Sequence, residues 1–213
     1  MAMWIVDSLR SQFGAPSGLF GSLFVAPFLN VANRRLMSTA IELLQPAEDD
    51  RVLDIGFGGG YSLFSLAERV PGGEIVGLDL SPDMVNAAAA LVKRHRLRSR
   101  VRVECGDVAS MPFRPAAFDK ALAANTIYYW PDLNAGMREI WRVLKHRGRL
   151  AVGFRSPANL RLFTLGWSNF RLYEPEEVAE VLLRTGFRVL RVEHRDKWWI
   201  PDTVVVLAER KKS

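Results

Sequence analysis

From residue 51 to the end of the chain, short apolar runs alternate with amphipathic stretches, and no other feature limits the fold as strongly. This alternation is typical of βαβ units, in which helices cover both faces of a mainly parallel sheet. Strands are expected at residues 51–55, 74–79, 101–105, 118–124, 149–154, 187–192 and 203–208. The sequence therefore predicts an α/β fold with a doubly wound, seven-stranded sheet.

Three stretches between these strands have the three- and four-residue apolar spacing of amphipathic helices. Their apolar residues are Met84, Val85, Ala88, Leu91 and Val92, then Leu133, Met137, Ile140, Trp141 and Leu144, and then Val178, Val181 and Leu182. The last two strands have no helical stretch between them, only residues 193–202 with Pro201. They should pair as an antiparallel hairpin at the end of the sheet.

Before residue 51 the pattern is helical, at residues 4–9 and again at residues 36–44, where Pro46 ends the second stretch. Between these helices, residues 14–30 are rich in Gly, Pro, Phe and Leu. The chain thus divides into a helical N-terminal extension, residues 1–46, and an α/β domain, residues 47–213. A chain of 213 residues with 49% hydrophobic content is large enough for one sizeable core.

The composition excludes several classes of protein. Cys105 is the only cysteine, so neither a disulfide framework nor a cysteine-based zinc site is available. No cluster of Cys, His and carboxylates has the spacing of a metal site, so no metal is expected. The first residues lack a basic segment, and no apolar run approaches the about 18 residues of a membrane span. A cytoplasmic protein is expected, with association to a membrane surface as an open alternative.

The formal net charge of +6 fits an anionic partner or a membrane surface, and it equally fits ordinary solubility. A basic run at residues 93–100 ends a predicted helix, where cations complement the helix dipole. No aromatic platform or appended recognition domain accompanies this run, so no nucleic-acid partner is expected.

A glycine-rich turn follows the first predicted strand. Asp54 lies near the end of that strand, and Gly56, Gly58 and Gly60 follow as the chain turns into a helix near Tyr61. Glycines lack the Cβ atoms that block a ligand, and the start of the helix presents free N–H groups. A dinucleotide-binding fingerprint would need glycine at position 61, so the turn favours another ligand, one whose cationic amine suits Asp54.

The second strand ends at Asp79, 19 residues beyond Gly60 and close to the about 20-residue spacing of a ribose-binding acid. Asp79 could instead cap the next helix, but Ser81 and Pro82 already supply a cap and a first-turn residue. A ribose-binding role for Asp79 is therefore favoured.

These segments resemble the class I S-adenosylmethionine-dependent methyltransferases, in the branch of small-molecule and quinone-type enzymes. Residues 52–60 are similar to the first family motif, with Phe57 and Gly59 where Cys and Thr are common, and residues 77–85 are similar to the second. Residues 106–113 resemble the third motif, residues 118–130 the fourth, and residues 142–150 the turn into the fifth strand. His146 and Arg147 depart from the Pro and Gly usual in that turn, which lies away from the cofactor.

The resemblance implies a Rossmann-like fold, the cofactor S-adenosyl-L-methionine and transfer of its methyl group to a small acceptor, an activity of the EC 2.1.1 class. It implies that Asp107 accepts from the adenine amino group while Val108 and Leu80 flank the ring. From the residues alone, Asp107 is equally a cap for a short turn. The implied cofactor-binding residues are Asp54, Gly56, Phe57, Gly58, Gly60, Asp79, Leu80, Gly106, Asp107, Val108 and Asn125.

Methyl transfer from a sulfonium mainly requires that the acceptor be held in line, and a base is needed if the acceptor is a hydroxyl or thiol. The candidates follow the fourth strand: Asn125 for a hydrogen bond to cofactor or acceptor, and Tyr128 and Tyr129 to orient an acceptor. None is a strong base at neutral pH. The three histidines, His95, His146 and His194, are assigned to the surface.

Residues 14–30 and 156–173 are strongly apolar and are expected to close the acceptor pocket. The apolar residues between 20 and 29 fit a lid, a core-packing helix or a shallow membrane contact, and their spacing does not choose between these. An apolar or aromatic acceptor, such as a lipid or quinone, is expected. The alternatives are a peripheral membrane-bound lipid or quinone methyltransferase and a cofactor-binding pseudoenzyme. The oligomeric state is not predicted.

Overall fold

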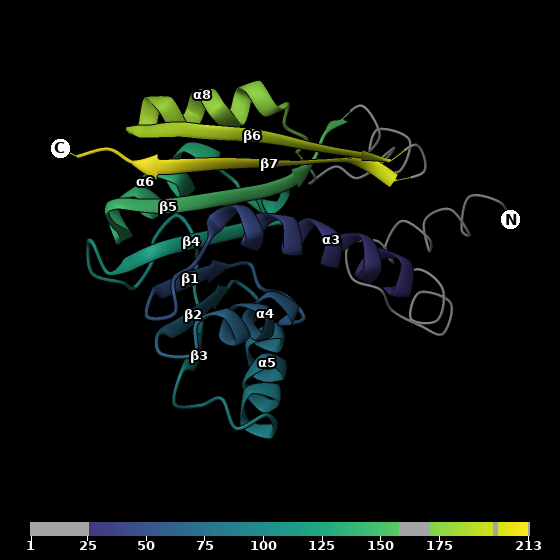
Figure 1. Ribbon diagram of the computed structural model, residues 1–213, viewed down its shortest axis with the longest axis vertical. Helices are drawn as coiled ribbons and strands as arrows, with labels where there is room; N and C mark the ends of the chain where they lie inside the picture. The colour runs from purple at the N-terminus through teal and green to yellow at the C-terminus, as the bar shows by residue number, and fades with distance from the viewer. Residues whose placement is uncertain (1–25, 158–170, 198–199, 213) are drawn as a thin grey trace, which may run out of the picture.

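The structure, a computed structural model, describes the backbone of residues 26–157, 171–197 and 200–212 (Figure 1). Side chains are described for residues 33–157, 171–195 and 203–212. The helix predicted at residues 4–9 lies outside this part of the chain, as do most of residues 14–30 and 156–173. Within the described part, every helix is too short or too polar to span a membrane.

Seven strands form one mixed sheet in the order β3-β2-β1-β4-β5-β7-β6 (Figure 1). They are β1 (Arg51–Ile55), β2 (Glu74–Asp79), β3 (Val101–Cys105), β4 (Phe118–Ala124), β5 (Leu144–Arg155), β6 (Phe187–Lys197) and β7 (Ile200–Arg210). Strands β1 to β5 are parallel, and β7 runs antiparallel between β5 and β6. The Rossmann-like sheet and its C-terminal antiparallel hairpin are confirmed.

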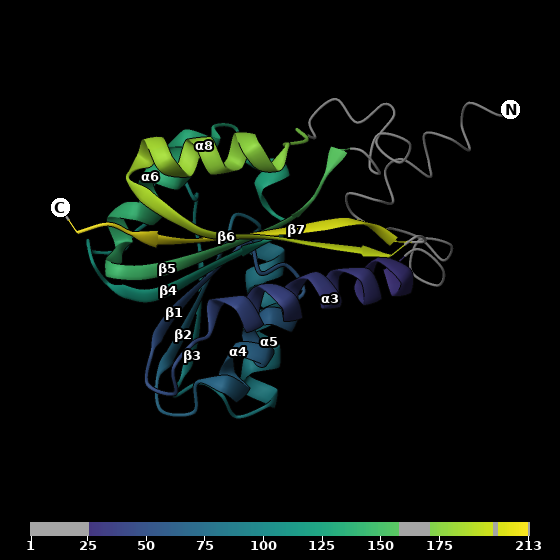
Figure 2. The same ribbon diagram turned by 45° about the horizontal axis from the view of Figure 1, so that its top comes forward.

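Helices cover both faces of the sheet (Figure 2). One face carries α3 (Ala26–Leu44), α4 (Tyr61–Arg69) and α5 (Pro82–Arg94), and the other carries α6 (Leu133–Val143) and α8 (Pro175–Thr185). A short 3-10 helix, η2 (Ile127–Tyr129), follows β4. Because each face has its own apolar core, the central strands are buried on both sides.

Helix α3 contains the predicted helix of residues 36–44 and packs along β5 and β7. Its buried residues Leu36, Ala40, Ile41 and Leu44 recur at helical spacing and belong to the core of the sheet. The helix begins at Ala26, so Asn30, which ends the Gly- and Phe-rich segment in the sequence, lies within its second turn.

The C-terminal hairpin is longer than predicted. We expected residues 193–202 to connect the two strands, but β6 continues to Lys197 and β7 begins at Ile200, with Pro201 as its second residue. This prediction was wrong because most side chains of residues 191–195 are exposed, which removes the apolar alternation that marks a half-buried strand. A proline near the start of a strand costs little pairing.

The turn into β5 also differs from the prediction. β5 begins at Leu144 and not at residue 149, and its pairing with β4 shifts register between Phe118 and Lys120. Arg147 has a φ of 61° there, in the left-handed region that favours glycine. The arginine that replaces the family's usual glycine therefore keeps a backbone conformation suited to glycine.

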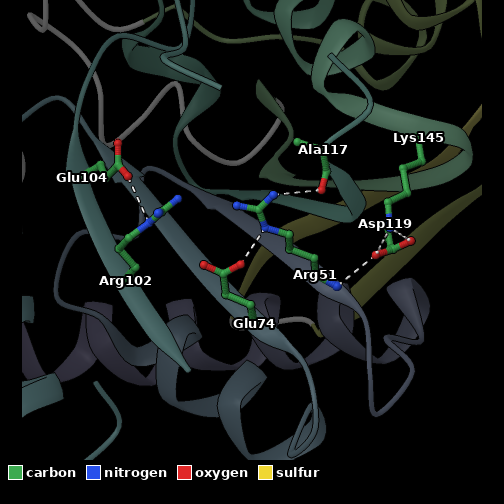
Figure 3. A network of polar contacts seen from close by, with 7 residues as sticks. All are labelled: Arg51, Glu74, Arg102, Glu104, Ala117, Asp119 and Lys145. Atoms are coloured by element: carbon green, nitrogen blue, oxygen red, sulfur yellow. Dashed lines mark hydrogen bonds and ion pairs between the residues drawn. The ribbon is translucent and has the colours of Figure 1, made fainter. Parts of the chain in front are cut away.

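A network of ion pairs joins the amino ends of the parallel strands (Figure 3). Arg51 Nε lies 2.7 Å from a Glu74 carboxylate oxygen, and the Arg51 backbone N–H donates to Asp119, which also binds Lys145 at 2.8 Å. The guanidinium groups of Arg51 and Arg102 point toward one another across a hollow of about 450 Å³. Arg102 pairs with Glu104 at 3.0 Å, so each of these two arginines has a carboxylate partner. The network is structural and lies opposite the carboxyl ends of the strands.

Candidate active site

The glycine-rich turn after β1 leaves its backbone open to a ligand. Gly56, Gly58 and Gly60 have φ values of 69°, 50° and 81°, in the left-handed region that glycine adopts without strain. A Cβ atom added at Gly58 or Gly59 would meet nothing within 4 Å. Helix α4 begins directly after Gly60 without a side-chain cap, so its first N–H groups can serve an acceptor.

Gly56 has a different role from the other glycines of the turn. A Cβ atom there would lie 2.1 Å from Thr126 Oγ1, a hydroxyl that also accepts a hydrogen bond of 3.2 Å from Trp130 Nε1. The residues that follow β4 therefore pack directly on the turn that follows β1. Gly56 permits this contact between two segments, in addition to shaping the turn.

Asp79 joins the end of β2 to the glycine turn. Its Oδ2 accepts from the Gly58 backbone N–H at 2.9 Å, and its Oδ1 accepts from the Ser81 backbone N–H at 3.0 Å. Ser81 is the N-cap of α5 and Pro82 its first residue, as the sequence predicted. Each carboxylate oxygen of Asp79 has two acceptor positions, so hydroxyl groups of a ligand can be bound in addition to these N–H groups.

Asp54 lies beneath the turn and is 1% exposed. Burial raises the pKa of its carboxyl group to about 7; a hydrogen bond from Ser62 opposes this shift, and the charge of Asp79 adds to it. Among the described residues, Asp54 Oδ2 has no hydrogen-bond partner. A buried carboxylate oxygen without a donor is costly, and a cation placed on the turn would offset that cost.

Leu80 and Asp107 form an exposed apolar and acidic surface beside Asp79. Leu80 is 68% exposed, an unusual position for leucine next to a strand end, and Asp107 is exposed as well. The Gly106 backbone N–H donates to the Asp79 carbonyl at 3.0 Å, which brings the end of β3 beside the end of β2. Asp107 Oδ1 accepts from Ala109 N–H at 2.8 Å, so Asp107 also caps the following turn, as the second interpretation of the sequence held.

Phe57 and Val108, two predicted cofactor contacts, have buried side chains. Phe57 is 1% exposed, and its ring lies so close to Gly77 that a Cβ atom there would be 2.7 Å away. The side chain of Phe57 is therefore part of the core and is not exposed to a ligand. Val108 is 7% exposed and belongs to the core on the α6 side of the sheet.

The three predicted catalytic residues lie together after β4 but differ in exposure. Asn125 has a φ of 57°, and its side-chain Nδ2 donates to Asn33 Oδ1 at 3.0 Å. Tyr128 is buried, its hydroxyl oxygen accepts from the Arg155 backbone N–H, and burial raises its pKa. Tyr129 is 53% exposed. Tyr128 thus stays protonated at neutral pH and supports β5, while Tyr129 is accessible to an acceptor.

Two polar residues that the sequence analysis missed complete this region. Arg155 ends β5 and is 8% exposed, and its Nη2 donates to Asn33 Oδ1 at 2.8 Å. Arg155 has a detectable sequence signal, a charged residue at the end of an apolar strand, as at Asp79. Asn33 has none, because it lies far away in the sequence, on the helix that precedes the sheet.

The carboxyl ends of β1, β2 and β3 thus present three acids in order, Asp54, Asp79 and Asp107, around an open glycine turn and the exposed Leu80. Ligands of open α/β sheets bind at this edge. The arrangement fits a ligand with a cationic amine, a ribose and a flat base, the three parts of S-adenosylmethionine. The fold and the position of these acids agree with the class that the sequence motifs indicate, the S-adenosylmethionine-dependent methyltransferases.

Comparison with known proteins supports this class. A family model described as a methyltransferase domain matches residues 52–148. Nocamycin O-methyltransferase of Saccharothrix syringae is 36% identical over 156 residues, which cover 72% of this chain and 54% of that protein. A demethylmenaquinone methyltransferase of Deinococcus radiodurans is 32% identical over 168 residues, which cover 65% of this chain and 68% of that protein. The chain belongs to the S-adenosylmethionine-dependent methyltransferases, and S-adenosylmethionine is the cofactor of that family.

Two further facts set the scope of these similarities. The chain spans about half the length of the nocamycin enzyme, 54% of it. The solved structure of the cyclase SpnF aligns with a TM-score of 0.73 at 23% identity and covers 84% of this chain and 81% of that one. At that identity the likeness shows the fold alone.

Proposed function

We propose that the protein transfers a methyl group from S-adenosylmethionine to a small apolar or aromatic acceptor. The observation that supports this most directly is Asp79, whose carboxylate binds the open glycine turn at Gly58 and keeps acceptor positions for a ribose. The family supplies the cofactor, and the relatives are named for methyl transfer to small molecules and to a quinone.

In this proposal, the residues at the three strand ends bind different parts of the cofactor. Asp79 binds the ribose hydroxyls, and Asp54 acts on the cationic amine through its charge, because its side chain is buried. The backbone of Gly58 and Gly60 and the start of α4 bind the carboxylate of the amino acid end. Leu80 and Asp107 contact the adenine, with Gly106, Val108 and the Phe57 backbone shaping the surface behind it.

When bound, the cofactor supplies a methyl group on a positively charged sulfur, which is a good leaving group. The chain then has to hold the acceptor atom near that methyl at an aligned distance of about 3 to 3.5 Å. We assign Asn125 and Tyr129 to orienting the acceptor, since both lie within three residues of Thr126, whose side chain packs against the Gly56 position of the turn. None of the three proposed catalytic residues is a strong base, so the acceptor site must favour an acceptor that needs none, or that is bound already ionised.

The proposal extends to parts of the chain whose structure is not described. Residues 14–30 and 156–173 are proposed to close the acceptor pocket, with residues 1–46 acting in part as a lid on the domain of residues 47–213. A shallow membrane contact by the same apolar residues is the alternative. The single Cys105 supports a reducing, cytoplasmic location.

Radioactive methyl transfer tests the function. Purified protein is incubated with labelled S-adenosylmethionine and a panel of phenols, quinols, amines, thiols and phospholipids, while calorimetry measures cofactor binding. We expect binding of S-adenosylmethionine or its demethylated product and transfer to a phenol or quinol. Binding of a nicotinamide dinucleotide in place of both would contradict the proposal.

A cofactor-binding protein without methyl transfer is the second candidate. It is favoured by one observation: none of Asn125, Tyr128 and Tyr129 is a strong base at neutral pH. Two results together would support this candidate. The protein would bind the cofactor without methylating any member of the panel, and Asn125→Ala and Tyr129→Phe would change ligand binding alone.

A further inference from the structure

The guanidinium group of Arg155 is buried at the carboxyl end of β5, and only part of it is bonded. Nη2 donates to Asn33 Oδ1 at 2.8 Å, whereas Nε has no hydrogen-bond partner among the described residues. The side chain is 8% exposed. A buried cation in such a position loses hydration that one neutral amide oxygen does not replace.

The packing of α3 on β5 explains why this side chain is buried. Gly153 faces α3, because a Cβ atom there would lie 3.2 Å from the Leu36 side chain. Arg155, two residues further along the strand, points to the same face. Asn33 lies one helical turn before Leu36 and therefore covers Arg155. The strand end and the helix together place a small polar cluster, Asn33, Asn125 and Arg155, at the end of an apolar interface.

A second arginine of β5, Arg149, has a carboxylate partner and serves as a comparison for Arg155. Arg149 lies opposite Glu209 in the sheet, and its Nε is 4.0 Å from a carboxylate oxygen of that residue. Arg155 lies opposite Thr203, a residue without charge. Among the residues whose side chains the structure describes, no carboxylate pairs with Arg155; the side chains of Asp196 and Asp202, near the connection between β6 and β7, lie outside that part of the chain.

This polar cluster adjoins the candidate active site. Asn33 Oδ1 accepts from Asn125 Nδ2 at 3.0 Å as well as from Arg155, so one oxygen joins the ends of α3, β4 and β5. Asn125 precedes Thr126, whose side chain contacts the Gly56 position of the cofactor turn. The cation therefore lies on the side of β4 away from β1, where an acceptor would approach a cofactor bound on the glycine turn.

We propose that Arg155, with Asn33 and Asn125, binds an ionised oxygen of the acceptor. That oxygen belongs to a phenolate, an enolate or a carboxylate group. This inference rests on the proposed methyl transfer and specifies the acceptor class as anionic aromatic or acidic molecules. An arginine beside a phenol or enol lowers the pKa of that hydroxyl, so the acceptor enters the site already deprotonated. The chain then needs no general base for an oxygen acceptor, which fits the absence of a strong base among Asn125, Tyr128 and Tyr129.

A spectroscopic titration tests the site without turnover. Wild-type protein is titrated with 4-nitrophenol, with and without S-adenosylhomocysteine, and the absorbance of the phenolate is followed against pH. We expect the apparent pKa of the bound phenol to fall by about one unit or more. The neutral ether 4-nitroanisole should bind at least about ten times more weakly, and benzoate tests whether carboxylates occupy the same site.

Variants assign the effect to Arg155. Arg155→Gln should abolish the pKa shift of the bound phenol and weaken phenolate binding about tenfold or more. Arg155→Lys should retain part of the pKa shift and part of the affinity. Arg149→Gln, a matched change on the same strand, should leave both unchanged. Thermal unfolding checks that each variant folds, and the wild-type comparison of phenol and ether needs no variant.

The outcomes separate this inference from the proposed function. Equal binding of 4-nitrophenolate and 4-nitroanisole, an unshifted phenol pKa in the wild type, or no binding of either anion would overturn the anion site. Benzoate displacement that depends on Arg155 supports the site and assigns it to carboxylates as well. Failure to bind either S-adenosylmethionine or its product would instead refute the proposed function, and it is measured separately.

Discussion

The side chain of Asp79 accepts a hydrogen bond of 2.9 Å from the backbone N–H of Gly58, which lies 21 residues earlier in the sequence, in the turn after β1. This bond holds the glycine turn in an open conformation before any ligand arrives. The acid that we assign to the ribose thus has two tasks, since it orders the turn and offers oxygen atoms to the cofactor. Preorganisation of this kind reduces the entropy lost on binding.

Replacement of Asp79 by alanine should weaken binding of S-adenosylmethionine by about 1 to 3 kcal/mol, because hydrogen bonds to a charged group are lost. Calorimetry measures this change. Asp83→Ala removes an exposed acid in the first turn of the neighbouring helix α5 and should leave affinity nearly unchanged. Equal effects of the two substitutions would show that net charge, and not the position of Asp79, controls binding.

The stability of the cofactor-free protein should decrease as the pH rises, through Asp54. Its pKa is raised to about 7 in the folded protein from 3.8 in the unfolded chain. Between these values the folded state holds a proton that the unfolded state has lost, so the free energy of unfolding falls by about 1.4 kcal/mol per pH unit and levels off above pH 7. Urea unfolding from pH 5 to pH 8 measures the decline.

Asp54→Asn is the control for that decline, because the amide does not titrate. The difference in stability between wild type and variant isolates the contribution of Asp54.

Cofactor binding should also release protons near pH 6.5 in the wild type, because a cationic amine on the turn favours the ionised carboxylate of Asp54. Calorimetry in two buffers of different ionisation enthalpy detects this release. Proton release of the same size in Asp54→Asn would show that another group is responsible.

Two glycines of the turn should respond differently to alanine. Gly56→Ala places a Cβ atom 2.1 Å from the Thr126 hydroxyl at a positive φ, so it should destabilise the protein by about 2 to 4 kcal/mol. Gly59→Ala points into open space and should change stability by less than about 0.5 kcal/mol. Thermal or denaturant unfolding compares the pair, and a similar loss in both would contradict the packing of Thr126 on the turn.

Arg147→Gly should stabilise the protein by about 0.5 to 1 kcal/mol, because glycine adopts the observed φ of 61° without steric cost. His146→Gly provides the comparison at the adjacent position, which has no positive φ, and there glycine should lower stability by a similar amount. Denaturant midpoints measure both. A destabilised Arg147→Gly variant would mean that the arginine side chain contributes more than its backbone conformation costs.

Methyl transfer should persist in EDTA. Among the residues whose side chains the structure describes, no group of three or more His, Cys, Asp or Glu is placed to hold a metal ion. The described histidines are all exposed, and His95 packs against Phe64 with ring centroids 5.1 Å apart. Turnover that is lost on chelation and restored by a divalent cation would overturn this expectation.

Sequence patterns were sufficient to predict the features of the structure that depend on residues close to one another in the chain. The order of strands and helices, the turn at Gly58 and Gly60, and the helix cap at Ser81 all follow from residues within a few positions of one another. Their periodicity and backbone preferences act before any tertiary contact forms. The family membership followed for the same reason, because its motifs are short and continuous.

Only the tertiary structure decided which of these residues face a ligand. Phe57 is part of the core and Tyr128 supports β5, although both stand inside motifs that the sequence assigned to the site. Arg155 and Asn33 are 122 residues apart and meet only because α3 packs along β5. Local patterns predict the elements because they are local, whereas the exposure and pairing of a side chain depend on segments that come together only when the whole sheet has formed.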